Sequence, residues 1–192
     1  MTTATLKSNT VSNTLADIAA AVEKIKNDGL QNFPEAASIG DAVRQGDVYI
    51  QLMDEADIEA LKLFYKQVPA EELENHLQLA PGNTKGSRHI LQSAAGLEMW
   101  LPVDSDEAIL TAIYKSKGEK MPANSNRWSH PYRKESDALE SALALAGPLF
   151  KCSTPNIVAH PEHGDWALPK GTYRVIFQRT VDESQRIRRV LD

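Results

Sequence analysis

The sequence predicts an α+β protein whose core is a mainly antiparallel β-sheet or a small β-barrel, with an N-terminal helix and inserted helices packed outside it. Three observations support this prediction. Short segments rich in β-branched or alternating residues are separated by turns that contain Gly and Pro. Helical patterns also occur, but they do not alternate regularly with the strands, as a parallel doubly wound sheet would require. The core strands are expected within residues 44–53, 87–103 and 148–182.

A chain of 192 residues is long enough for one domain with a buried core. We expect residues 1–13 to be a flexible N-terminal arm and residues 14–192 to form a single α+β domain. The arm is polar and has no apolar stretch of the kind that a signal peptide carries. Helical insertions into the domain are expected at about residues 54–79 and 104–147.

Each helix is predicted from a capping residue followed by apolar residues at helical spacing. Thr14 begins the N-terminal helix, and Asp54 begins the first inserted one. Pro69 starts a short helix with acidic residues in its first turn, where the helix dipole favours negative charge. Asp104 together with Glu107 is expected to cap the helix that follows.

The clearest strand covers residues 173–181. It is rich in β-branched and aromatic residues and carries apolar side chains on both faces, which indicates a central or covered strand. Residues 166–168 are expected to be its hairpin partner across the turn at residues 169–171. A Gly-Asp turn signal at Gly46 precedes an alternating segment, residues 48–53, which is predicted as the first strand of the main sheet.

Composition restricts the class of function. A formal net charge of −5 does not favour binding of duplex nucleic acid, because phosphate contacts need a basic surface. The single cysteine, Cys152, excludes an internal disulfide and a zinc site with several thiolates. No apolar run is long enough to predict a membrane span. The expected location is the cytoplasm, and the expected partner is an unknown protein or a small molecule.

Histidines mark the segments with the most chemistry. His160 and His163 lie in a turn with Gly164, and His89 lies where a loop is expected to meet a strand. On a regular strand, residues three apart would point to opposite faces, but a turn can bring them together. Functional side chains often lie where a loop leaves a rigid scaffold. We therefore expect His89 to lie beside His160 and His163 in space.

Two classes of function follow from this pattern. The preferred one is a non-catalytic module that binds a protein partner or a small ligand near the His160–His163 turn and the long loop at residues 118–135. The candidate ligand-binding residues are Arg88, Trp128, Tyr173 and Arg179.

The alternative is a metal-dependent enzyme of the hydrolase type. His89, His160 and His163 would hold a divalent metal such as zinc, and Glu162 or Asp165 would act as general base on the metal-bound water. The chain has no His-Glu-x-x-His motif, no Gly-x-Ser-x-Gly elbow and no phosphate-binding P-loop. These absences favour the binding module.

Four segments, taken in order, resemble a family of small, uncharacterised bacterial and phage-borne proteins. That family opens with a Gly-Asp-Val strand, carries a Gly-x-x-His segment, and closes on His-x-x-His, Leu-Pro-x-Gly-x-Tyr, Gln-Arg and Arg-Arg-Val motifs. In many of its sequences the second motif is Gly-His-x-His, and here Ser87 stands in place of the first histidine. The resemblance implies positions for a site and no particular activity. The matching segments are residues 44–48, 86–89, 160–179 and 188–192.

Overall fold

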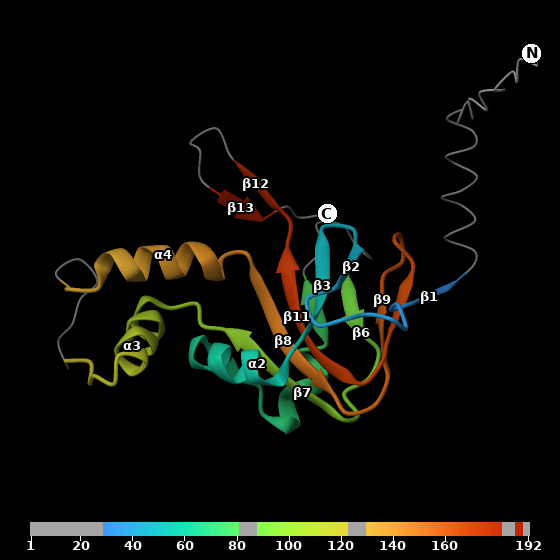
Figure 1. Ribbon diagram of the computed structural model, residues 1–192, viewed down its shortest axis with the longest axis horizontal. Helices are drawn as coiled ribbons and strands as arrows, with labels where there is room; N and C mark the ends of the chain where they lie inside the picture. The colour runs from blue at the N-terminus through green and yellow to red at the C-terminus, as the bar shows by residue number, and fades with distance from the viewer. Residues whose placement is uncertain (1–28, 81–87, 123–129, 182–186, 190–192) are drawn as a thin grey trace, which may run out of the picture.

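The computed structural model describes residues 29–80, 88–122, 130–181 and 187–189, and its strands form two large β-sheets and a small two-stranded one (Figure 1). Every neighbouring pair in the six-stranded sheet is antiparallel. With the helices described below, this arrangement confirms the α+β class. The order across this sheet is β2 (Ala42–Gln45), β3 (Val48–Met53), β11 (Gly171–Phe177), β8 (Ala146–Cys152), β7 (Leu97–Pro102) and β4 (Tyr65–Gln67).

The five-stranded sheet contains the one parallel pair among the described strands, which joins β1 to β10. The described strands form open sheets and not the small barrel that was the alternative. The order is β1 (Leu30–Asn32), β10 (Asp165–Leu168), β9 (Asn156–Ala159), β6 (His89–Leu91) and β5 (Gln78–Ala80). The small sheet pairs β12 (Arg179–Val181) with β13 (Ile187–Arg189).

Helices occupy both segments that were predicted as insertions. Asp54 caps α2 by accepting a hydrogen bond from the backbone N–H of Ala56 at 2.9 Å. Ser105, and not Asp104, caps α3, because Ser105 is extended and its Oγ accepts from the N–H of Ala108 at 3.2 Å. The helical elements are α2 (Glu55–Leu61), the 3₁₀ turns η1 (Lys62–Phe64) and η2 (Ala70–Asn75), α3 (Asp106–Ser116) and α4 (Arg133–Leu143).

The segment at residues 54–79 is not purely helical. It also contains β4, at the edge of the six-stranded sheet, and most of β5, at the edge of the other sheet. Each of these strands has three residues, which is too short for a periodic pattern to show in the sequence. The arm expected at residues 1–13 and the helix expected from Thr14 lie outside the described residues.

The strand predicted from residue 173 onward is β11, and it is central, since it lies between β3 and β8. It ends at Phe177, and from Arg179 the chain forms part of the separate two-stranded sheet. The hairpin expected between residues 166–168 and this strand is wrong, because β10 pairs with β1 and β9 in the other sheet. The chain therefore crosses from one sheet to the other at Pro169 and Lys170.

Apolar side chains from both large sheets form one core cluster. Tyr173, Val175 and Phe177 of β11 and Val48 and Ile50 of β3 enter it from the six-stranded sheet. The five-stranded sheet contributes a second set to the same cluster, which shows that the inner faces of the two sheets pack together. This set includes Leu79, Ala80, Leu91, Val158 and Leu168.

The outer face of the six-stranded sheet carries a smaller cluster. Ile58 of α2 packs there on Trp100 and Leu149, all three being at most 4 % exposed. In Figure 1, α2 lies against this sheet, whereas α4 extends away from the strands β8 and β11. No helix in the described part of the chain is long and apolar enough to span a membrane.

Candidate functional site

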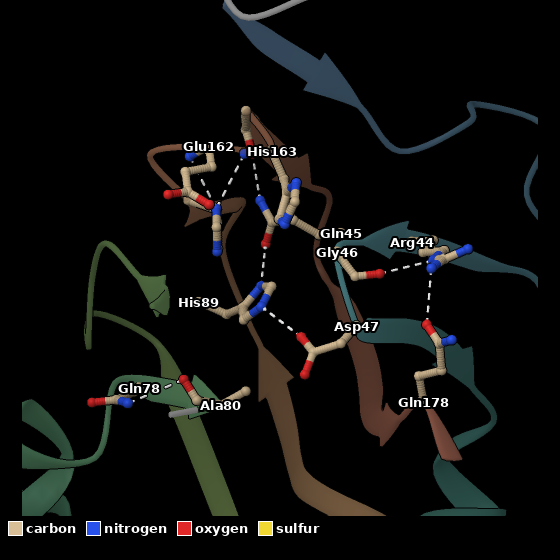
Figure 2. A network of polar contacts seen from close by, with 12 residues as sticks. Arg44, Gln45, Gly46, Asp47, Gln78, Ala80, His89, Glu162, His163 and Gln178 are labelled. Carbon is tan, nitrogen blue, oxygen red and sulfur yellow. Dashed lines mark hydrogen bonds and ion pairs between the residues drawn. The ribbon is translucent and has the colours of Figure 1, made fainter. Parts of the chain in front are cut away.

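The three histidines singled out in the sequence lie in one row. The ring centroids of His89 and His160 are 4.4 Å apart, and those of His160 and His163 are also 4.4 Å apart and stacked. The row lies beside Gln45, the last residue of β2, and Asp47, which lies in the turn between β2 and β3 (Figure 2). The expected proximity of His89 to the other two histidines is confirmed.

Gln45 places a proton on Nδ1 of His89. Its side-chain Nε2 donates to the carbonyl oxygens of Val158 and Gly164, so its Oε1 must face the ring of His89. The distance from His89 Nδ1 to Gln45 Oε1 is 2.9 Å. Because an amide oxygen only accepts, Nδ1 of His89 carries a proton and donates it.

Asp47 occupies the other side of the same ring. Its Oδ1 lies 3.2 Å from Nε2 of His89, and the two side chains are 3 % and 1 % exposed (Figure 2). A hydrogen bond across this distance needs a proton on Nε2, which makes an imidazolium–carboxylate pair, or a proton on Asp47. Either arrangement is buried away from solvent and links the turn between β2 and β3 to β6.

His160 organises the turn that follows β9. Its Nδ1 accepts hydrogen bonds from the backbone N–H groups of Glu162 and His163, both at 3.1 Å. The backbone N–H of His160 in turn donates to Oδ1 of Asp165 at 3.1 Å. Gly164 has a φ of +75°, a conformation that glycine adopts without strain. The histidine and the aspartate thus shape a tight turn.

The clustered histidines do not converge as ligands of a metal. Among the described residues, no group of three or more His, Cys, Asp or Glu side chains has the geometry to hold a metal ion. Nδ1 of His89 is a donor to Gln45, and Nδ1 of His160 is occupied by two backbone N–H groups. A zinc-binding role for His89, His160 and His163 stays a prediction without support from this arrangement.

The other candidate residues are spread over the fold. Glu162 is exposed in the turn, and Asp165 is half-buried at the start of β10. Arg88 and Arg179 are exposed. Trp128 lies outside the described residues.

Tyr173 is fully buried between the sheets. Its ring stacks on Phe150 at 5.3 Å, and its hydroxyl donates to the carbonyl oxygen of Pro169 at 2.8 Å. Burial raises the pKa of this phenol. These contacts make Tyr173 part of the core.

A separate cavity of about 400 Å³ lies on the outer side of the six-stranded sheet. Its walls come from η1 and β4, from α4 and the residues after it, and from β8 and β11. Nine of its eleven lining residues are apolar, and the other two are Tyr65 and Arg174. The apolar ones are Leu61, Phe64, Leu139, Ala142, Leu143, Leu145, Ala146, Val175 and Ile176.

A hydrogen bond through Nε fixes the orientation of the Arg174 guanidinium group. Its Nε donates to Oε1 of Gln51 at 2.6 Å, and Gln51 faces it directly in the β3–β11 pairing. Nε2 of Gln51 donates to the carbonyl oxygen of Gly40, which fixes the amide with its oxygen toward Arg174. None of the described carboxylates forms an ion pair with Arg174.

Tyr65 is the second polar group of the cavity. Burial raises the pKa of its phenol to about 12, and the nearby positive charge of Arg174 opposes this rise. The hydroxyl is therefore protonated at neutral pH and can donate a hydrogen bond.

Neither site was fully visible in the sequence. The Gly-Asp turn signal includes Asp47, but nothing in the sequence predicted that Gln45 and Asp47 would contact His89. Nothing predicted a cavity beside Arg174 either. Comparison with models of protein families, with curated proteins and with solved structures finds no match for this chain.

Proposed function

We propose that this protein is a non-catalytic binding module that takes up a small ligand in the cavity between α4 and the six-stranded sheet. The observation that carries the proposal is the cavity itself, whose volume of about 400 Å³ lies in the range of small-molecule sites. An apolar lining with two polar groups is also typical of such sites.

The helix α4 supports this assignment. Its apolar residues Leu139 and Leu143 are only half-buried, and Ser136 is its one buried residue. An amphipathic helix is normally stabilised by burying its apolar stripe. A ligand in the cavity would complete the burial of this stripe.

The ligand is placed at α4 and not at the His160–His163 turn because the rings of His89 and His160 are committed to the fold. His89 and His160 are 1 % and 2 % exposed, and both are hydrogen-bonded. Two other cavities are of similar size. One of about 440 Å³ near Phe33 has Glu35 and Lys170 in its lining. The other, of about 420 Å³ beside α3, is lined in part by Lys66, Glu107 and Lys115. The mixed charge of both makes them poorer sites for an apolar ligand.

Binding of an uncharged fluorescent probe tests this function. 1-Naphthylamine should bind the wild-type protein with enhanced fluorescence, because it is largely apolar and small enough for the cavity. Ala142 lines the cavity from α4, so Ala142→Trp should fill the space and abolish the enhancement. Ser141 is exposed like Ala142, but it does not line the cavity and lies about 100° away round the helix, so Ser141→Trp is the matched control. Equal binding by both variants, or no binding by the wild type, would contradict the proposal.

A further inference from the structure

We infer that the ligand of this cavity is a small monocarboxylate with an apolar body, whose carboxylate binds Arg174 and Tyr65 and whose body packs on α4. This inference rests on the proposed function and names the class of molecule that the cavity accepts.

The charge in the cavity points to an anion. Arg174 is the one charged residue among the eleven that line it, and no described carboxylate pairs with it. Arg174 is half-buried, and a guanidinium group partly removed from water is normally paired, because desolvating a charge is costly. A carboxylate from a ligand would supply the missing negative charge.

The orientation of Arg174 suits a carboxylate. Gln51 holds the guanidinium through Nε, at 2.6 Å, and Gln51 is itself fixed by its bond to Gly40. The two terminal nitrogens, Nη1 and Nη2, form a planar fork that matches the two oxygens of a carboxylate. Gln51 is thus a positioning residue, since it orients Arg174 and does not line the cavity.

Tyr65 adds a neutral donor beside this fork. Its hydroxyl carries its proton at physiological pH, as an ordinary phenol does, and burial raises its pKa further, to about 12. A protonated phenol donates to a carboxylate oxygen without adding a second charge.

The rest of the lining limits both the charge and the size of the ligand. A phosphate would bring a further charge and further oxygens, but the other nine lining residues have apolar side chains that donate no hydrogen bonds. With about 30 Å³ for a group the size of a water molecule, a volume of about 400 Å³ holds on the order of ten non-hydrogen atoms. An acid of medium chain length fits this volume.

Calorimetric titration with octanoate and 1-octanol tests the inference, because the two probes share the chain and differ in the charged end. Octanoate should bind the wild type about tenfold or more tightly than 1-octanol, as expected for a charge-assisted hydrogen-bonded pair. Arg174→Gln should weaken octanoate binding by about tenfold or more and leave 1-octanol binding unchanged. Tyr65→Phe should weaken octanoate alone, by a smaller factor.

Arg44→Gln is the matched control. Arg44 also donates to a glutamine oxygen, that of Gln178 at 2.8 Å, but it is exposed and lies outside the cavity. Its replacement should leave the binding of both probes unchanged. Far-ultraviolet circular dichroism establishes that each variant is folded, and Tyr65→Phe, which removes one oxygen atom, carries the test if Arg174→Gln does not fold.

The outcomes distinguish a wrong ligand class from a wrong proposed function. If octanoate and 1-octanol bind equally and Arg174→Gln affects neither, the carboxylate assignment is wrong while the cavity remains a binding site. If 1-naphthylamine binds but neither aliphatic probe does, the ligand class is again wrong. If none of the three compounds binds, the proposed function itself fails.

Discussion

Replacing Gln45 by leucine tests whether the buried polar network stabilises the fold. Gln45 is 1 % exposed, and its amide contacts His89, Val158 and Gly164 at once. Leucine has a similar volume, so Gln45→Leu removes three hydrogen bonds without opening a large cavity. The backbone oxygens and the imidazole would then be left in the interior without these partners.

The expected loss follows from the number of bonds and their burial. A buried polar group that loses its partner costs about 1–3 kcal/mol, and two of the three contacts are fully buried while the bond to Gly164 is partly buried. We expect the free energy of unfolding to fall by about 3 kcal/mol. For a protein of this size, that loss corresponds to a decrease in Tm of about 6–12 °C.

Urea unfolding followed by circular dichroism measures this change. The midpoint should fall while the slope m stays constant, because the surface exposed on unfolding is unchanged. Gln78→Leu is the matched control, since Gln78 is exposed and its amide bonds only to the nearby carbonyl oxygen of Ala80. Its effect should stay within about 0.5 kcal/mol. Equal effects of the two substitutions would refute the stabilising role of the network.

Three further predictions follow from the packing and the titrating groups. A Cβ atom at Gly147 would lie 2.6 Å from Cγ1 of Val175, so Gly147→Ala should lower the free energy of unfolding by about 1–3 kcal/mol, and an unchanged urea midpoint would contradict this. Burial raises the pKa of the Cys152 thiol to about 11, which lowers its thiolate fraction at every pH below that value. Iodoacetamide at pH 8 should therefore alkylate the native protein far more slowly than the unfolded one, and equal rates would count against it. Protein purified without a histidine tag should contain no stoichiometric metal by elemental analysis; near-stoichiometric zinc that is lost in His160→Ala would instead favour the metal-dependent enzyme.

The central strand was predictable because its own residues determine it. In β11, Tyr173 and Val175 alternate with Arg174 and Ile176, and the structure places the first pair in the core between the sheets. The short strands β4 and β5 were not predictable, since three residues carry no period and pairing with a distant neighbour decides their conformation. The predicted hairpin between β10 and β11 was wrong for a similar reason. The prediction relied on the adjacency of these two strands along the chain, which does not decide their pairing.

The sequence predicted part of the histidine cluster and nothing of the cavity beside α4. Proximity of His89 to His160 was predictable from turns that adjoin strands, and β6 and β9 are indeed paired. The contacts of Gln45 and Asp47 were not, because they join residues more than 40 positions apart through specific atoms. The cavity could not be predicted, because its walls come from separate segments of the chain. No local sequence pattern indicates how far a helix lies from a sheet.

The crossing between β10 and β11 restricts how the protein can move. Only Pro169 and Lys170 separate the two strands, so the Cα atoms of Leu168 and Gly171 can be at most about 11 Å apart. Packed sheets lie about 10 Å apart, so this link leaves almost no slack at that corner. The two sheets therefore cannot separate at this corner. The cavity beside α4 lies on the outer side of the six-stranded sheet, away from this link, and α4 is joined to the sheet at one end by the residues before β8.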